Sequence, residues 1–266
     1  MSRLLCTLAV IAAIALTSCG GGDGGQTDYT LNASPGGIWV GSDVVTGLAI
    51  VGLTDELGNF QLIRADGMQI VGEALTAADA LYANTEEITA FGKTFPDGAT
   101  HGSGILNGTI AERSSLAGEI QFTTDAGTGA HIVFGPAPST GLEFDGSYFE
   151  SSTLAIIAGT YTYVPTGTVV TVDLNGAIFA QDATTGCVIN GSVSIIEETY
   201  NVYRVQGTAA SCQGAAAVLN GIKFNGLATL QDTVSPQNVI VGLIGSNNTV
   251  KYAFAYTLTR SSPPPM

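Results

Sequence analysis

The chain has 266 residues, and its 22 acidic side chains outnumber the 8 basic ones, which gives a formal net charge of −14 at pH 7. Such a surface repels phosphate backbones and anionic headgroups, which argues against a nucleic-acid partner and against membrane binding through a polybasic patch. Only 11% of the residues are charged and 45% are hydrophobic, so the chain carries ample apolar material for a folded core.

The amino-terminal segment has the composition of an export signal. Arg3 precedes an apolar run that ends at Leu16 and is too short to span a bilayer. The sequence Leu16–Cys19 resembles the lipobox of bacterial lipoproteins. The resemblance implies that residues 1–18 are a signal peptide and that Cys19 is acylated and anchors the protein in a membrane. The alternative is ordinary secretory cleavage beside an incidental cysteine.

The segments at both ends of the predicted mature chain are expected to be unstructured. Residues 19–35 are rich in glycine and polar side chains, which predicts a flexible tether. Gly20 stands where, in enterobacterial lipoproteins, an aspartate favours retention in the inner membrane. The lipoprotein resemblance therefore points to the outer membrane, on its periplasmic face or at the cell surface. Residues 261–266 are Ser and Pro followed by Met, which predicts a disordered tail.

Between these ends the chain has the pattern of short β-strands. Apolar runs rich in Val, Ile and Thr are separated by Gly, Asn, Asp and Pro, and strong helix formers are scarce. In the first half the predicted strands are Gly37–Ser42, Gly47–Thr54, Asn59–Ala65, Met68–Leu75, Tyr82–Phe91, Gly104–Arg113, Leu116–Thr124 and Ala130–Phe134. In the second half they are Gly159–Val164, Thr168–Leu174, Ala177–Gln181, Cys187–Ile196, Val202–Ala209, Phe224–Gln231, Val239–Ile244 and Val250–Arg260.

The two series look like two copies of one design. Gly67–Ala74 matches Gly186–Val193 in its two glycines and its apolar positions. We predict an N-terminal β-domain at residues 36–135, a linker with a short helix at 136–158 and a C-terminal β-domain at 159–260. Because open meanders leave edge strands that aggregate, we expect an all-β protein with two tandem, antiparallel barrels of about eight strands each. One larger barrel or a sandwich is the alternative.

The start of each series carries an aromatic residue after a glycine. Gly37-Ile38-Trp39 resembles the opening of lipocalin-like (calycin) barrels, in which the tryptophan packs at the closed end against an arginine from the last strand. By that resemblance, Tyr161 and Arg260 are the equivalent pair in the second copy. Trp39, Tyr161 and Arg260 are therefore our candidates for closing a barrel or lining its cavity.

A wider pattern in the second half is similar to uncharacterised proteobacterial lipoproteins. It comprises Asp182–Cys187, Val193–Ile196 and Tyr200–Tyr203. That family has no known activity, so the resemblance supports a location and adds nothing about function.

The cysteine content fits an exported protein. With Cys19 acylated, Cys187 and Cys212 are the only thiols outside the signal peptide. A hairpin register that pairs Ile196 with Tyr203 places these two cysteines directly opposite each other, which predicts a disulfide.

Catalytic motifs are weak. His101 lies near Asp97 and Ser103, from which a hydrolase triad can be drawn, but no Gly-x-Ser-x-Gly accompanies it. We interpret this segment as a polar hairpin loop and His131 as a surface residue. We interpret Glu86-Glu87 as solvated charges. No catalytic residue, metal site or cofactor is predicted.

The aromatic residues are a better indication of binding. Tyr252, Phe254 and Tyr256 share one face of a predicted strand, and Ala253 and Ala255 share the other. If the aromatic face points inward it fills or lines a barrel, and if it points outward it marks an interface.

These observations favour a membrane-anchored envelope lipoprotein with non-catalytic β-barrels. Its expected partners are the membrane, through the acyl chains, and a small apolar or glycan ligand or an envelope protein. The alternatives are a structural component of the outer membrane and a hydrolase that uses the His101 loop. An interior space large enough for a ligand would favour binding.

Overall fold

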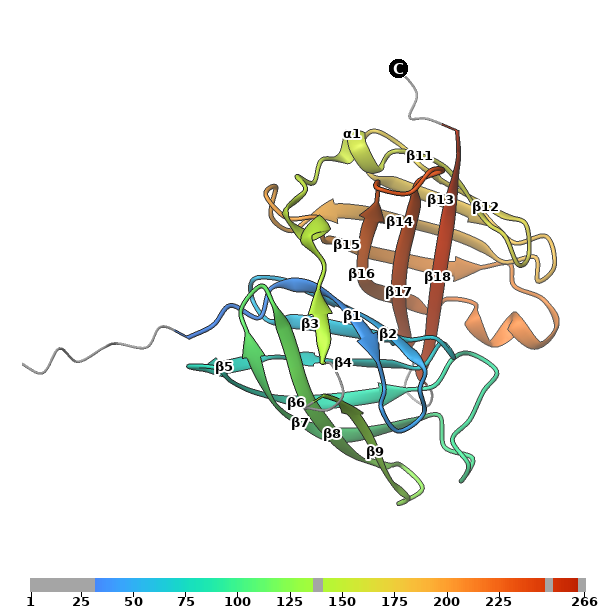
Figure 1. Ribbon diagram of the computed structural model, residues 1–266. Helices are drawn as coiled ribbons and strands as arrows, with labels where there is room; N and C mark the ends of the chain where they lie inside the picture. Colours follow the sequence, from blue (N-terminus) through green and yellow to red (C-terminus); the bar gives the residue numbers. More distant parts are fainter. Residues whose placement is uncertain (1–31, 136–140, 247–250, 263–266) are drawn as a thin grey trace, which may run out of the picture. The chain divides into compact units, whose positions relative to one another are not determined.

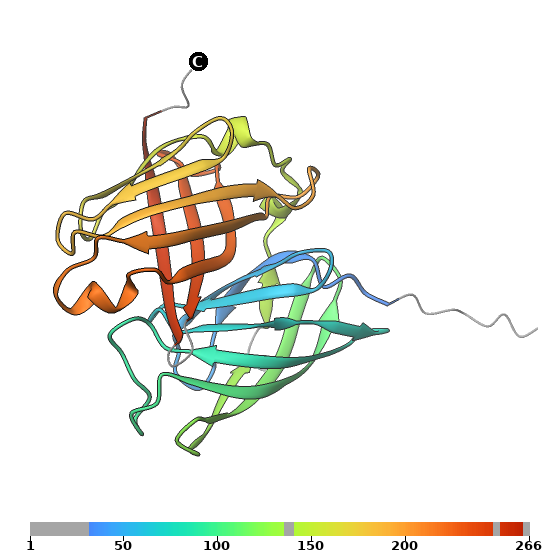
Figure 2. The same cartoon turned by 180° about the vertical axis from the view of Figure 1, so that it is seen from behind.

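The computed structural model describes residues 32–135, 141–246 and 251–262, which form two antiparallel β-barrels (Figures 1 and 2). Both barrels belong to one compact unit, Leu31–Met266. The all-β fold with two tandem barrels is therefore confirmed. The signal segment, Cys19, most of the predicted tether and residues 263–266 lie outside the described residues.

The N-terminal barrel contains all eight strands predicted for it and two short additional ones. Its strands are β1 Gly37–Ser42, β2 Ala49–Thr54, β3 Asn59–Arg64, β4 Gln69–Glu73, β5 Leu75–Ala77, β6 Ala80–Ile88, β7 His101–Ala111, β8 Ser115–Thr124, β9 Gly129–Phe134 and β10 Leu142–Phe144. The ring runs β10-β1-β2-β3-β4-β6-β7-β8 and closes where β10 pairs with β8. Strand β5 pairs with β6 and lies off this path.

Strand β10 corrects the predicted domain boundary. We expected the N-terminal domain to end at residue 135, yet β10 inserts between β1 and β8, with Trp39 opposite Phe144 and Leu142 opposite Leu116. The first barrel is therefore completed by residues that the sequence analysis assigned to the linker. Strand β9 pairs with β8 from Gly118 to Thr123. The amide of Val133 in β9 donates a hydrogen bond to Asp43 Oδ1 at 3.3 Å.

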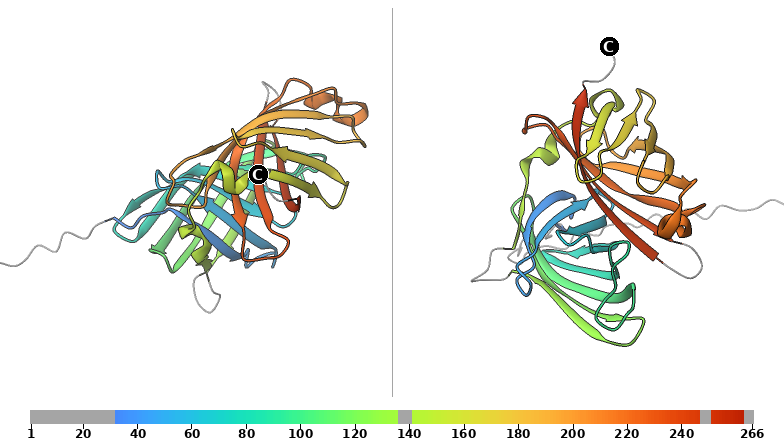
Figure 3. Two further views of the ribbon diagram at one scale, coloured as in Figure 1. Left: turned by 90° about the horizontal axis from the view of Figure 1, so that it is seen from above. Right: turned by 90° about the vertical axis from the view of Figure 1, so that its right-hand side faces the viewer.

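The C-terminal barrel contains the eight strands predicted for it. They are β11 Gly159–Tyr163, β12 Thr168–Val172, β13 Ala177–Gln181, β14 Val188–Ile195, β15 Tyr203–Ala210, β16 Lys223–Gln231, β17 Asn238–Ser246 and β18 Lys251–Ser262. Each strand pairs with the next, and β18 pairs with β11 to close the ring; Figure 3 shows these strands coloured from yellow to red.

Among the described residues, three short helical turns connect strands: two lie between β10 and β11, and one lies between β15 and β16 of the second barrel. They are η1 Gly146–Phe149, α1 Leu154–Ile157 and η2 Gly214–Leu219. The short helix predicted within the linker is α1, and it is capped by Thr153, whose side chain accepts a hydrogen bond from the Ile156 amide.

Corresponding turns precede the fourth strand of each barrel. Gly67 and Gly186 have φ angles of 88° and 71°, a backbone conformation that favours glycine. They lie just before β4 and β14. The sequence match between these segments thus coincides with equivalent places in the two barrels, although gene duplication itself stays a prediction.

The predicted disulfide between Cys187 and Cys212 is present. The predicted register is wrong by one residue, because Ile195, not Ile196, pairs with Tyr203. Strand β15 ends at Ala210, and Ser211 has a φ of 59°, so the chain turns before Cys212. This turn brings Cys212 to Cys187 although the two are not paired across the ladder.

Candidate functional site

The interior of the N-terminal barrel is filled by its own side chains. One continuous cluster contains Trp39, Ile70, Ile120 and Phe134, all of which are fully buried. The Trp39 ring packs edge-on against Phe144 with their centroids 5.5 Å apart. Trp39 is therefore a core residue of a packed barrel.

The C-terminal barrel encloses a cavity of about 310 Å³. Many of its inward-facing side chains keep accessible surface, because they border this space instead of packing against one another. The wall includes Val170, Ile178, Ile189, Leu243, Phe254 and Tyr256. This hollow interior is the candidate functional site.

The two faces of β18 have different roles. Phe254 and Tyr256 line the cavity, so the aromatic face points inward. Ala253 on the opposite face is 1% exposed and lies next to Ala90 of the N-terminal barrel, with which it forms a parallel β-bridge. One face of this strand thus borders the cavity and the other contacts the first barrel.

Tyr161 and Arg260, the pair that the calycin resemblance implies, are in contact, and Tyr161 lines the cavity. Arg260 Nη2 donates to Tyr161 Oη at 2.6 Å, and the guanidinium lies 5.2 Å from the ring centroid. Tyr161 Oη donates to the Ile157 carbonyl at 2.6 Å, and Arg260 Nη2 also donates to the Ile156 carbonyl at 2.5 Å. Burial raises the pKa of Tyr161 while the charge of Arg260 opposes that rise. The pair joins α1 to the last strand of the barrel.

Polar groups are few and gather toward the end of the cavity away from Tyr161. The lining there includes Tyr163, Thr166, Asp182 and Tyr256, and no Lys, Arg or His of the described ranges lines the cavity. The rings of Tyr163 and Tyr256 meet edge to face with centroids 4.9 Å apart. Burial, aided by the neighbouring Tyr163 and Asp182, raises the pKa of Tyr256. The Tyr256 hydroxyl is therefore neutral near pH 7, and no partner for it lies within hydrogen-bond distance among the described residues.

Strand pairing places these tyrosines beyond the closed part of the barrel seam. Strands β11 and β18 pair from Thr160 to Thr162, and the pairing stops before Tyr163. The hairpin loop between β11 and β12 follows directly, and its Thr166 lines the cavity. This end therefore contains the groups able to hydrogen-bond a bound molecule.

The structure does not assemble the His101 triad. His101 Nε2 pairs with Asp125 Oδ2 at 2.6 Å, whereas Asp97 accepts hydrogen bonds from the Ala99 amide and the Thr124 hydroxyl. No hydrogen bond joins Ser103 to His101 among the described residues. His131 is exposed and pairs with Glu119 at 3.1 Å, which fits the predicted surface position. The part of the chain that the structure describes contains no cluster of three or more potential metal ligands.

The interpretation of Glu86-Glu87 as solvated charges is wrong. Glu86 forms an ion pair with Lys251 of the second barrel. Glu87 points into the N-terminal barrel, is fully buried and accepts a hydrogen bond from the Thr85 hydroxyl at 2.5 Å. Its Oε2 has no hydrogen-bond partner among the residues that the structure describes. Burial raises the pKa of Glu87 to about 7.

Glu87 gives a prediction about stability and pH. The folded protein holds this proton more tightly than the unfolded chain, in which the carboxyl has its ordinary pKa of 4.5. The stability that protonated Glu87 contributes is therefore complete below pH 4.5 and is lost as the pH rises to about 7. Glu87→Gln should not lose this stability. Between pH 4.5 and about 7, its free energy of unfolding in urea should therefore rise relative to that of the wild type. Parallel stability curves for the two proteins would contradict the assignment.

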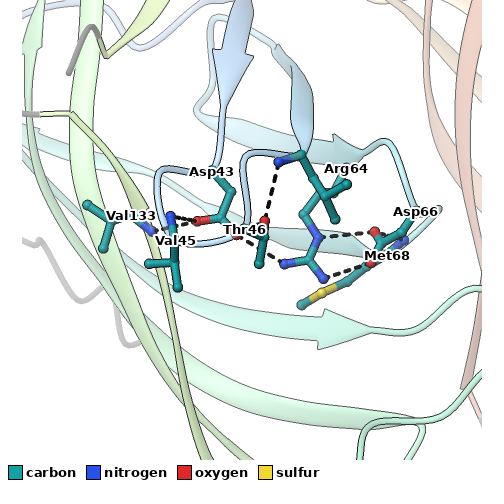
Figure 4. Close-up of polar contacts among 8 residues, drawn as sticks. Asp43, Val45, Thr46, Arg64, Asp66, Met68 and Val133 are labelled. Carbon is teal, nitrogen blue, oxygen red and sulfur yellow. Dashed lines mark hydrogen bonds and ion pairs between the residues drawn. The ribbon is translucent and has the colours of Figure 1, made fainter.

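A charged network closes the turns of β1–β2 and β3–β4 (Figure 4). The buried Asp43 carboxylate accepts hydrogen bonds from the Thr46 hydroxyl at 2.6 Å and from Arg64 Nη1 at 3.3 Å. Arg64 also binds Asp66 through two hydrogen bonds of 3.0 and 2.8 Å. Burial acts to raise the pKa of Asp66, but Arg64 outweighs it and the pKa lies below its usual value. All three charges are paired, so we assign this network to structure.

Two buried glutamines that the sequence analysis did not single out link the barrels. Gln61 Oε1 accepts a hydrogen bond from the Leu227 amide at 2.7 Å, and Gln61 Nε2 donates to Gln69 Oε1 at 2.5 Å. Gln69 Nε2 then donates to the Phe254 carbonyl at 2.6 Å. Gln61 and Gln69 are otherwise surrounded by apolar strand residues, and this contrast is the only sequence signal that could have marked them.

No protein-family model matches the chain, and no curated protein matches it. Fold and site alone therefore define the class: an all-β protein of two closed, eight-stranded antiparallel barrels, the second of which encloses an apolar cavity. Within the described ranges, no helix is both long enough and apolar enough to cross a bilayer.

The contrast between the two interiors gives a matched pair of substitutions. Ala83 lies in the packed cluster of the first barrel, whereas Ala180 borders the cavity of the second. Ala83→Leu overfills a packed interior and should lower the free energy of unfolding by about 1–3 kcal/mol. Ala180→Leu places its added carbons in the cavity and should be neutral or stabilising. Denaturant unfolding checks both, and equal losses would mean that the two interiors are packed alike.

Proposed function

We propose that the protein binds one small, neutral, apolar molecule inside its C-terminal barrel and does so without catalysis. The observation that carries this proposal is the cavity of about 310 Å³ with its nearly continuous apolar wall. Ligand cavities in proteins span about 300 to 1,000 Å³ and combine apolar walls with a few polar groups. The volume is at the lower end of that range, which favours a single small ligand.

The chemistry of the wall favours an apolar ligand over a glycan or an anion. A buried sugar needs partners for several hydroxyls, and the described wall has few polar side chains to offer. An anion would lose its hydration without meeting a Lys, Arg or His among the lining residues. The Tyr163 and Tyr256 hydroxyls supply one or two hydrogen bonds, enough for a single hydroxyl or carbonyl group on the ligand.

We further propose that the protein is a lipoprotein of the outer membrane, anchored through acyl chains on Cys19. The lipobox-like sequence Leu16–Cys19 and the glycine that follows it support this location. The Cys187–Cys212 disulfide fits an oxidising compartment outside the cytoplasm. Intact-mass measurement of the protein from membranes should show loss of residues 1–18 and acylation of the new terminus. An unmodified Cys19 sulfur, or a retained leader, would overturn the location.

Two adjacent valines on β12 provide the test of ligand binding. Val170 lines the cavity, whereas Val169 is 46% exposed on the outer face of the same strand. Val170→Trp should fill the cavity and lower the affinity for the neutral fluorophore N-phenyl-1-naphthylamine by at least about tenfold, which corresponds to about 1.4 kcal/mol. Val169→Trp is the matched control and should bind like the wild type. Equal binding by both variants would place the bound probe outside the barrel.

A further inference from the structure

A loop of the N-terminal barrel forms part of the wall of the C-terminal cavity. Phe91 follows β6 of the first barrel, yet its side chain lines the cavity of the second. Its ring stacks on Phe254 with centroids 5.4 Å apart and meets Tyr252 edge-on at 5.1 Å. An aromatic residue from one barrel thus extends the aromatic wall of the other.

The backbone beside Phe91 is bound to the part of β18 that β11 does not reach. The Ala253 amide donates to the Thr89 carbonyl at 3.2 Å, and the Phe91 amide donates to the Ala253 carbonyl at 3.0 Å. Strand β11 pairs with β18 only from Thr259 onward. The loop of the first barrel therefore takes the place of a strand neighbour along the opposite half of β18.

The first barrel holds this loop in a fixed conformation. The Thr89 hydroxyl donates to the carbonyls of Lys93 at 2.9 Å and Thr100 at 3.1 Å. Lys93 Nζ donates to the Asp66 carbonyl at 2.6 Å. Gly92 has a φ of 80°, which a residue with a side chain rarely adopts. Phe91 is consequently positioned by its own barrel and not by the ligand site alone.

The glutamine network keeps the same region of the two barrels together. Gln69 Nε2 donates to the carbonyl of Phe254, the residue on whose ring Phe91 stacks. Small residues permit this approach, because a Cβ on Gly242 would meet Gln61 Nε2 at 2.8 Å. Phe91 is thus held at the cavity wall both by its backbone hydrogen bond to Ala253 and by the packing of its ring on Phe254.

We propose that Phe91 sets the upper size limit of the ligand, so that the filled N-terminal barrel acts as a specificity element for the hollow C-terminal one. This inference rests on the proposed function, because it concerns the molecule bound in the same cavity. A neutral apolar molecule lies along the wall between Tyr161 and Phe254. The Phe91 ring, which stacks on Phe254 in the same half of the barrel as Tyr163 and Tyr256, limits the length of the molecule at that end.

A series of straight-chain primary alcohols, titrated as competitors of N-phenyl-1-naphthylamine, tests this limit. In the wild type, affinity should rise about fourfold for each added methylene and then stop rising when the chain fills the cavity. In Phe91→Ala the rise should continue for further carbons. Alcohols just beyond the wild-type limit should then bind on the order of tenfold more tightly to the variant. Phe91→Leu should extend the limit less, and Phe91→Trp should shorten it.

Phe95→Ala is the matched control from the same loop region. Phe95 packs on Phe122 inside the first barrel with centroids 5.4 Å apart and is not among the residues that line the cavity. Its removal should leave the chain-length limit unchanged. A uniform loss of affinity for all alcohols in Phe91→Ala, or an unchanged limit, would overturn the role of Phe91. Absence of alcohol and probe binding in the wild type would instead overturn the proposed function itself.

Discussion

Trp39→Ala is expected to lower the free energy of unfolding by about 3–5 kcal/mol, the range for removing a large aromatic side chain from a packed core. Trp39 is fully buried, lies opposite Phe144 of the closing strand and packs against its ring. The substitution therefore creates a void where β1 meets β10 and weakens the closure of the barrel. Urea unfolding followed by circular dichroism measures the loss.

Tyr82→Ala provides the matched comparison within the same barrel. Tyr82 is also aromatic but is 50% exposed on the outer face of β6. Its removal should change the free energy of unfolding by less than about 1 kcal/mol. If Trp39→Ala were no more costly than Tyr82→Ala, the assignment of Trp39 to the packed core of the N-terminal barrel would be wrong.

Removal of the disulfide through the double substitution Cys187→Ser and Cys212→Ser is expected to cost about 3 kcal/mol of stability in the chain-entropy view. The bond closes a loop with a sequence separation of 25, and both cysteines are buried beside Phe224 and η2. Without the bond, the unfolded chain gains conformational freedom and the folded cluster loses a fixed contact. The melting temperature measures the effect.

Reduction of the wild type supplies the control for this prediction. A thiol reductant should lower the melting temperature of the wild type toward that of the double variant and leave the variant unchanged. A wild type whose melting temperature is unaffected after full reduction, verified by thiol counting, would show that the bond contributes little to stability.

The strands were predictable because the alternation of apolar and polar residues, and the turn residues between strands, are local signals. The predicted bounds of Gly37–Ser42 and Ala177–Gln181 agree with β1 and β13. Strands β5 and β10 have three residues each, which is too short for a periodic pattern. Closure of the first barrel depends on β10, so the sequence predicted a barrel without predicting the strand that completes it.

The end of the C-terminal barrel was predictable only through a resemblance. Tyr161 and Arg260 are far apart in the chain, and the calycin-like pattern is what suggested that they meet. The cysteine pairing was correct although the register was not, because the turn at Ser211 compensates for the shift. A strand register that is extended from a single residue pair cannot predict the turn at Ser211.

The cavity and its surroundings could not be read from the sequence. Alternation identifies inward positions such as Val170 and Tyr256, but whether their side chains fill the ring depends on the summed volume of eight strands. The role of Phe91 depends on a contact with Ala253 and Phe254, which lie in the other barrel. Glu87 is buried on the face of β6 that also carries Leu81 and Ala83, whereas charge patterning alone suggested that it is exposed.

Xenon binding in a crystal under pressure tests the hollow interior most directly, because apolar cavities of this kind take up xenon. We predict xenon density inside the C-terminal barrel, beside Phe254 and Tyr256, and none within the packed cluster around Trp39. Val170→Trp should abolish that density and Val169→Trp should retain it. A C-terminal barrel without xenon, its aromatic side chains collapsed into the space, would contradict the ligand-binding function.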